Sequence, residues 1–159
     1  LVNAACANQK VRPKLILAGR HNYNHSDDIA SRIQSSTAKE YIQVLGELNR
    51  SQLNSLIAGS IALVNPSEYE GFGLTLVEAM ALGTPVIAAS GGSVPEVMGN
   101  AGILVQPRDV NSLSHAMLSV MHNAELRNTL TKYGKTKVNE FSWDKTAQLT
   151  LNVLLNAGK

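Results

Sequence analysis

The sequence predicts an α/β fold in which helices cover both faces of a doubly wound parallel sheet. Short apolar runs alternate along the chain with longer segments whose apolar residues recur at helical spacing. The apolar runs are continuous, as expected for parallel strands that are covered on both faces. Glycine or another loop-forming residue follows each run. Together these features are typical of a Rossmann-like fold.

Five segments are predicted to be strands. Residues 61–64 (IALV) and 86–89 (VIAA) are continuous apolar runs, whereas residues 41–45 (YIQVL) are mixed and are expected nearer an edge. The other two strands are residues 14–18 and 103–105. Because parallel strands are joined by right-handed crossovers, their carboxyl ends should lie along one edge of the sheet. Ligands of this fold class bind at that edge.

Helices are predicted between the strands from capping residues and apolar spacing. Residues 27–36 place three apolar side chains on one face, and Asn49 with Gln52 forms a capping box before the next helix. Residues 74–82 are good helix formers, and Gly83 ends them. Further helices are expected to start at Pro95, Asp109, Asn123 and Ser142.

Composition and charge exclude several classes of function. A chain of 159 residues suffices for one domain with a proper core. A net charge of +2, with 4% aromatic residues, does not indicate a nucleic-acid surface. The single cysteine, Cys6, excludes an internal disulfide and fits a reducing, cytoplasmic setting. No apolar run approaches the length of a membrane span.

The central segment of the chain runs from residue 65 to residue 89. It comprises a strand end, a loop containing Gly71 and Gly73, a short helix and the next strand. Glycines between a buried strand and a helix allow the backbone to approach a ligand closely. The helix N-terminus presents unpaired N–H groups and a partial positive charge, which suit a phosphate.

Two glutamates place hydrogen-bond acceptors beside this predicted anion site. Glu78 is the only charged residue of the predicted helix, and a buried carboxylate needs a partner. Its side chain should lean toward the helix N-terminus and the loop that carries Glu70, so the two acids should converge. Donors for phosphate and acceptors for hydroxyls are what a sugar nucleotide requires. The segment therefore predicts a sugar-nucleotide site.

Residues 70–78 (EGFGLTLVE) resemble the E-x7-E motif of the retaining, GT-B-fold glycosyltransferases of group 1, the family-four class. The resemblance extends in order along nearly the whole chain, and it implies that residues 1–159 form a nucleotide-sugar donor-binding domain, the C-terminal half of a GT-B fold. The other matching segments are residues 66–67, 78–86, 94–97, 100–107 and 141–143.

The resemblance implies a role for each residue of the motif. Glu78 would accept hydrogen bonds from the ribose hydroxyls, and Glu70, the candidate catalytic residue, would face the donor sugar near the reacting carbon. The backbone around the start of the helix would bind the sugar and the phosphates through Gly71, Phe72, Gly73, Leu74 and Thr75. The nucleotide base would lie against Gly19, Arg20, Leu45 and Gly46.

Each role has a structural alternative. For Glu78 it is a buried carboxylate that caps backbone N–H groups, and for Glu70 it is an exposed loop acid. Glu68 is expected to be only a solvated charge. The glycine loop could instead be an ordinary turn between a strand and a helix. The Arg20 side chain could simply be solvated.

Part of the family's pattern is absent from this sequence. In the family, the C-terminal domain opens with a strand that ends in a glycine-arginine turn and then a lysine, and this pair would contact the diphosphate. Residues 1–5 correspond to the helix after that turn. The leading strand, the basic pair and the acceptor-binding N-terminal domain are therefore expected to be missing, and the chain is interpreted as a fragment that is inactive alone.

The implied function is retaining transfer of a hexose from a UDP-, GDP- or ADP-sugar to an acceptor hydroxyl, in glycan or polysaccharide biosynthesis. No metal cofactor is expected, since no Asp-x-Asp arrangement occurs and the helix dipole with basic side chains would neutralise the diphosphate. The glycan or lipid-linked acceptor would bind through the missing domain. Nucleic acid is not an expected partner. Any contact with the inner face of a membrane would also lie outside this domain.

Two other functions stay open. The first is a non-catalytic Rossmann-like interaction domain with an unused pocket, although a buried acid without a role would be a cost. The second is a nucleotide-sugar epimerase of GT-B architecture, which would be expected to carry further acids and histidines around the cleft. Product analysis without an acceptor would distinguish the glycosyltransferase from the epimerase, because only the epimerase would epimerise the donor sugar.

Overall fold

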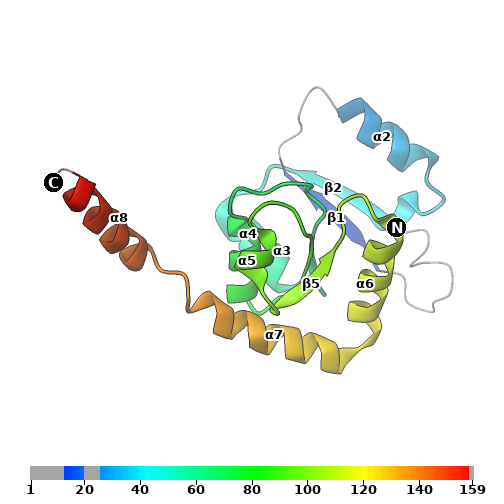
Figure 1. Cartoon of the computed structure of the whole chain (residues 1–159). Helices are drawn as coiled ribbons and strands as arrows, with labels where there is room; N and C mark the ends of the chain where they lie inside the picture. The colour runs from blue at the N-terminus through cyan, green and yellow to red at the C-terminus, as the bar shows by residue number, and fades with distance from the viewer. Residues whose placement is uncertain (1–12, 20–25, 158–159) are drawn as a thin grey trace.

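The computed structural model of the chain describes residues 13–19 and 26–157 (Figure 1). The α/β class is confirmed, and each predicted strand is present with its ends shifted by at most two residues. The elements are β1 (Leu15–Ala18), α2 (Ser26–Ser35), a 3₁₀ turn (Lys39–Tyr41), β2 (Ile42–Gly46), α3 (Arg50–Ala58), β3 (Leu63–Asn65), α4 (Leu74–Ala81), β4 (Val86–Ala89), α5 (Val94–Met98), β5 (Gly102–Val105), α6 (Val110–His122), α7 (Ala124–Val138) and α8 (Trp143–Ala157).

All strand pairs are parallel, as predicted, but they form two sheets instead of one. Strand β1 pairs with β2, and the second sheet has the order β3-β4-β5. Within the described residues no ladder joins β1 to β3, so each of these strands is paired along one edge only. The predicted absence of a leading strand is not tested by this arrangement and stays a prediction.

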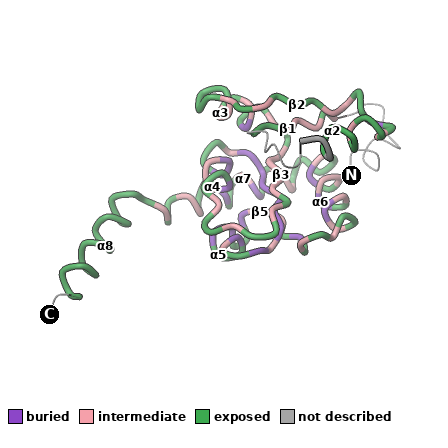
Figure 2. Tube along the Cα trace, turned by 90° about the horizontal axis from the view of Figure 1, so that it is seen from above, coloured by how far each residue is buried: buried purple, intermediate pink, exposed green. Residues whose placement is uncertain are grey.

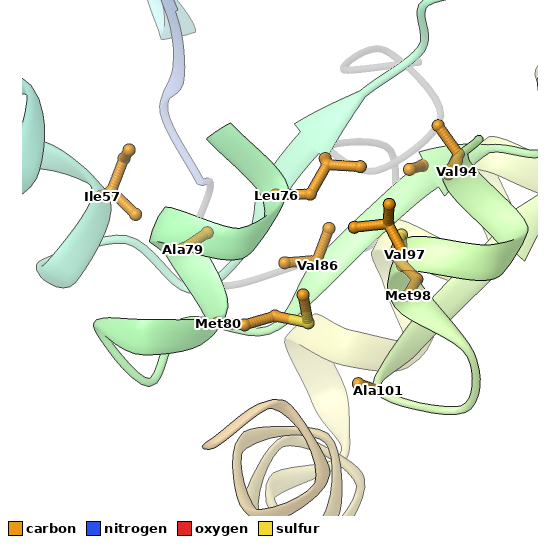
Figure 3. Close-up of a cluster of buried hydrophobic side chains, with 10 residues drawn as sticks. Ile57, Leu76, Ala79, Met80, Val86, Val94, Val97, Met98 and Ala101 are labelled. Atoms are coloured by element: carbon orange, nitrogen blue, oxygen red, sulfur yellow. The ribbon is translucent and has the colours of Figure 1, made fainter. Parts of the chain in front are cut away.

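Strand β4 separates two hydrophobic cores. Because successive side chains of a strand point to opposite faces, Val86 faces the core formed with α3, α4 and α5, whereas Ile87 faces α6 and α7. Figure 3 shows the first core, in which Met80, Val97 and Met98 lie near Val86, and Ile57 lies on the other side of α4 beside Ala79. The two helical layers on one sheet are what a doubly wound fold requires.

The prediction that the continuous apolar strands are covered on both faces is confirmed for β4 but not for β1, and the exposure of β2 agrees with its predicted place nearer an edge. All four residues of β4 are buried, whereas β1 is half-buried and Val44 and Leu45 of β2 are exposed. In the described part of the chain, the small cluster around Ala38 covers only one end of this pair. Figure 2 shows the same contrast, with buried residues around α4, α5 and α7 and an exposed β2.

Helix α7 packs directly on α4, and α8 does not pack on the body. A side chain at Gly134 would lie 3.3 Å from the Met80 side chain, so a glycine lets the two helices approach closely. Helix α8 starts after Ser142, as predicted, and extends away from the other elements (Figure 1). None of its described residues is buried, and Trp143 is 78% exposed. Among the helices that the structure describes, none has the length and apolarity needed to cross a membrane.

Candidate functional site

The candidate site begins at the carboxyl end of β3, where Asn65 organises the loop that follows. Its Oδ1 accepts a hydrogen bond from the Ser67 backbone N–H at 3.0 Å, and its Nδ2 donates to Oε1 of Glu70 at 3.1 Å. One amide side chain therefore both turns the chain after the strand and orients the Glu70 carboxylate. Asn65 was not among the predicted site residues.

The backbone of this loop packs tightly against the loop that follows β4. Glu70 and Gly92 form a parallel bridge, and the backbone N–H and hydroxyl of Ser93 both donate to the Glu70 carbonyl, at 3.1 and 3.2 Å. A side chain at Gly91 or Gly92 would overlap the carbonyl oxygen of Glu68 or Glu70, respectively. Gly92 also has a φ of +59°, which favours glycine. Two consecutive glycines in the sequence are the signal from which this close backbone contact could have been predicted.

The N-terminus of α4 has no side-chain cap. Gly73 occupies the N-cap position with a φ of +83°, and its carbonyl accepts from the Leu76 N–H at 2.9 Å. Leu74 and Thr75, the first two helical residues, are exposed. The N–H groups of a first helical turn have no intrahelical partner, so this terminus can bind an anion from outside the helix.

Phe72 attaches the same loop to the segment that follows α7. Its ring meets the ring of Phe141 edge-to-face, with the centroids 5.6 Å apart and the planes at 89°. The ammonium group of Lys137 lies 5.7 Å from the Phe141 centroid. The sequence had suggested only a backbone role for Phe72, because the ring contact joins two segments that are distant in the chain.

The partner that the partly buried Glu78 requires is Arg50, the first residue of α3. Nη1 of Arg50 lies 2.6 Å from Oε1 of Glu78, and the Glu78 side chain is 24% exposed. Within the described residues no backbone N–H group donates to the Glu78 carboxylate. The expected convergence of Glu70 and Glu78 near the start of α4 stays a prediction. Arg50 was missed at the sequence level, although a cation in the first turn of a helix is an unfavourable placement.

The predicted base-binding residues lie together at the carboxyl ends of β1 and β2. The Gly19 N–H donates to the Gly46 carbonyl at 2.8 Å, and both glycines have positive φ, +146° and +68°. Leu45 beside them is 37% exposed. Arg20 lies outside the described residues, as do His21 and His25, to which no role was assigned.

Glu68, expected to be only a solvated charge, is exposed but paired with Arg108. The guanidinium donates from Nε to Oε1 at 2.6 Å and from Nη2 to Oε2 at 2.9 Å. These hydrogen bonds from Arg108 lower the pKa of Glu68 and raise that of Arg108. Arg108 has a φ of +64°, which is uncommon for a residue other than glycine. The pair links the Glu70 loop to the segment after β5.

Residues 1–137 match the model of the family described as "Glycosyl transferases group 1". The chain belongs to this family. It is 34% identical over 143 residues to the O-antigen chain mannosyltransferase B of Escherichia coli, a match that covers 90% of this chain and 37% of the relative. Over 110 residues it is 38% identical to the MMP α-(1→4)-mannosyltransferase of Mycolicibacterium hassiacum, covering 67% of this chain and 27% of the relative.

Solved structures show the same fold for this group 1 chain. Sucrose-phosphate synthase from Thermosynechococcus elongatus matches with a TM-score of 0.83 at 27% identity, over 99% of this chain and 42% of that one. HepE of Anabaena in complex with UDP matches with a TM-score of 0.85 at 22% identity, over 98% of this chain and 44% of that one. The predicted GT-B class is thereby confirmed. The chain spans about a third of the length of the first curated relatives.

Two further features concern metal ions and other small ligands. Among the residues that the structure describes, no group of three or more histidine, cysteine or acidic side chains is placed to hold a metal ion. The expectation of metal-independent donor binding stays a prediction.

A shallow hollow on α7 is lined by Thr131, Lys132, Lys135 and neighbouring polar residues, and it contains none of the predicted site residues.

Replacing Gly92 by alanine should destabilise the fold by about 1–3 kcal/mol, because the new side chain would strike the Glu70 carbonyl at an unfavourable φ. Gly71→Ala is the matched control, since nothing lies within 4 Å of a side chain there. It should change the free energy of unfolding by less than about 0.5 kcal/mol. Urea denaturation measures both, and equal losses would contradict the packing described for the loop.

The Glu68–Arg108 pair should contribute stability in a pH-dependent way. Because the folded-state pKa of Glu68 is below its usual 4.5, the contribution is present above pH 4.5 and is lost as the pH falls through the folded-state value. The difference in unfolding free energy between wild type and Arg108→Met should therefore shrink in acid. Asp109 keeps its own Ser112 partners in both proteins.

Lys132→Met, which removes an exposed cation from α7, is the control for this measurement. Its difference from wild type should not follow the titration of Glu68. An Arg108→Met difference that persists unchanged through the acid range would show that the ion pair contributes nothing to stability.

Proposed function

We propose that this chain is the donor-binding domain of a retaining glycosyltransferase. The observation that carries the proposal is one continuous unit: a loop fixed at Glu70, an uncapped N-terminus of α4, and Glu78 one helical turn further on. This unit offers hydrogen-bond donors for a diphosphate with carboxylates on either side of them. Membership of the group 1 family supports the proposal, because its relatives include proteins named as mannosyltransferases.

Each part of the donor has a proposed place. The diphosphate binds the N–H groups of Leu74 and Thr75, where the helix dipole favours negative charge. The ribose hydroxyls donate to Glu78. The hexose lies between Glu70 and the backbone of residues 71–73. The base lies against the paired turns at Gly19 and Gly46, with Arg20 as a further proposed contact.

The proposed chemistry is transfer of the hexose from the nucleoside diphosphate to an acceptor hydroxyl with retention of configuration. Catalysis comes from positioning and from stabilisation of the departing diphosphate by the first turn of α4. The Asn65 amide holds the Glu70 carboxylate, so Glu70 is proposed to orient the sugar and not to attack it. The acceptor binds to another part of the full-length enzyme, and the isolated chain is proposed to be inactive and to need no metal.

The relatives suggest where this reaction belongs. The Escherichia coli relative is named for an O-antigen chain, which supports glycan or polysaccharide biosynthesis as the proposed pathway. HepE was solved with UDP and with UDP-glucose, so UDP is the first nucleotide to test, beside GDP and ADP. A cytoplasmic location, with any membrane contact made outside this domain, is part of the same proposal.

Calorimetric titration with UDP, GDP and ADP tests the proposal. We expect saturable binding of one nucleotide, weakened about ten- to a hundredfold in Glu78→Gln because a charged acceptor with two oxygens is replaced by a neutral amide with one. Glu96→Gln, which neutralises an exposed acid of α5, is the control and should bind like wild type. Equal affinity in wild type and Glu78→Gln would rule out the ribose role, and no binding of any nucleotide at millimolar concentration would contradict the donor site.

A further inference from the structure

Arg50 stands where a helix disfavours a cation. It is the first residue of α3 and lies between Asn49 and Gln52, which form the capping box, and the first turn of α3 contains no acid to compensate its charge. The partial positive charge of a helix N-terminus repels a cation at this position. The compensating charge comes instead from a different helix, through Glu78 of α4. A residue that violates a local preference in this way calls for a functional explanation.

The Arg50–Glu78 pair joins the first turn of α3 to α4. Nη1 of Arg50 lies 2.6 Å from Oε1 of Glu78. The Arg50 side chain is 71% exposed, whereas the Glu78 side chain is 24% exposed, so the pair lies at the surface with Glu78 on its inner side. A carboxylate has two oxygens with about four acceptor positions, so Glu78 can accept hydrogen bonds from a ligand while it is paired with Arg50.

The two helices that carry the pair are held rigidly to each other. Ile57 of α3 packs in the same core as Ala79 of α4, the residue after Glu78. The buried hydroxyl of Thr84 donates to the Ile57 carbonyl at 2.8 Å. Arg50 is therefore attached to a frame that does not depend on the ion pair itself, and its removal should leave the relation of α3 to α4 intact.

We propose that Arg50 is a positioning residue for nucleotide binding, which fixes the Glu78 carboxylate so that Oε2 meets the ribose hydroxyls. The inference rests on the proposed donor-binding function and extends it to a residue outside the E-x7-E motif. A free glutamate side chain must lose its rotamer freedom when it binds the ribose. In this protein the ion pair with Arg50 removes that freedom before the nucleotide arrives, which favours binding.

The test compares nucleotides that have ribose hydroxyls with nucleotides that lack them. UDP, GDP and ADP, each beside its 2′,3′-dideoxy counterpart, are titrated into wild type, Arg50→Met and Arg50→Lys. We expect wild type to prefer the ribose form, and Arg50→Met to reduce that preference about three- to tenfold while the affinity for the dideoxy form stays unchanged. Arg50→Lys keeps the cation without the planar fork and should retain part of the preference.

Lys132→Met, which removes a cation from α7, is the control and should keep the full preference. Thermal unfolding of each variant shows that the fold is intact. If Arg50→Met weakens the binding of the ribose and dideoxy nucleotides equally, the inference is overturned. Arg50 would then affect binding only through its charge or through the stability of the fold. Tighter ribose binding would overturn it as well, since Arg50 would then compete with the ribose. If wild type binds no nucleotide, or shows no ribose preference, the proposed ribose role of Glu78 fails together with the inference.

Discussion

The close packing of two backbone loops is the constraint on which the candidate site depends. The loop after β3 can lie against the loop after β4 only because Gly91 and Gly92 have no side chains. This approach lets Ser93 donate twice to the Glu70 carbonyl and holds Glu70 beside Asn65. The contact fixes the path of the backbone into Gly73, and therefore the place where the first turn of α4 presents its N–H groups.

The buried cores around β4 support the loops of the candidate site. Buried β4 lies between two cores, and α4 packs on α7 where Gly134 allows close approach. Phe72 adds a ring contact to Phe141 in the segment that follows α7. The Glu70 loop is thus attached to β3, to the loop after β4 and to the segment that follows α7. The proposed donor site would benefit from such support, because a preorganised loop loses little conformational freedom when a ligand binds.

Local sequence patterns predicted the helices and strands well. They could not predict which residues from distant segments of the chain contact each other. Capping residues such as Asn49 and Asp109 start helices where expected, because a cap depends only on neighbours in the chain. The need of Glu78 for a partner was also predictable from its apolar surroundings, whereas the identity of Arg50 was not. The incomplete burial of β1 was not predicted, since a continuous apolar run shows that a strand can be covered and does not show that another layer lies over it.

A crystal structure of the chain with the nucleoside diphosphate that binds it would test the central claim most directly. Our account predicts the diphosphate oxygens within hydrogen-bond distance of the Leu74 and Thr75 N–H groups, and the ribose hydroxyls on Oε2 of Glu78. The Glu70 loop should keep its contacts with Gly92 and Ser93 in the complex. A nucleotide bound elsewhere, for example with its diphosphate beside the lysines of α7, would contradict the account.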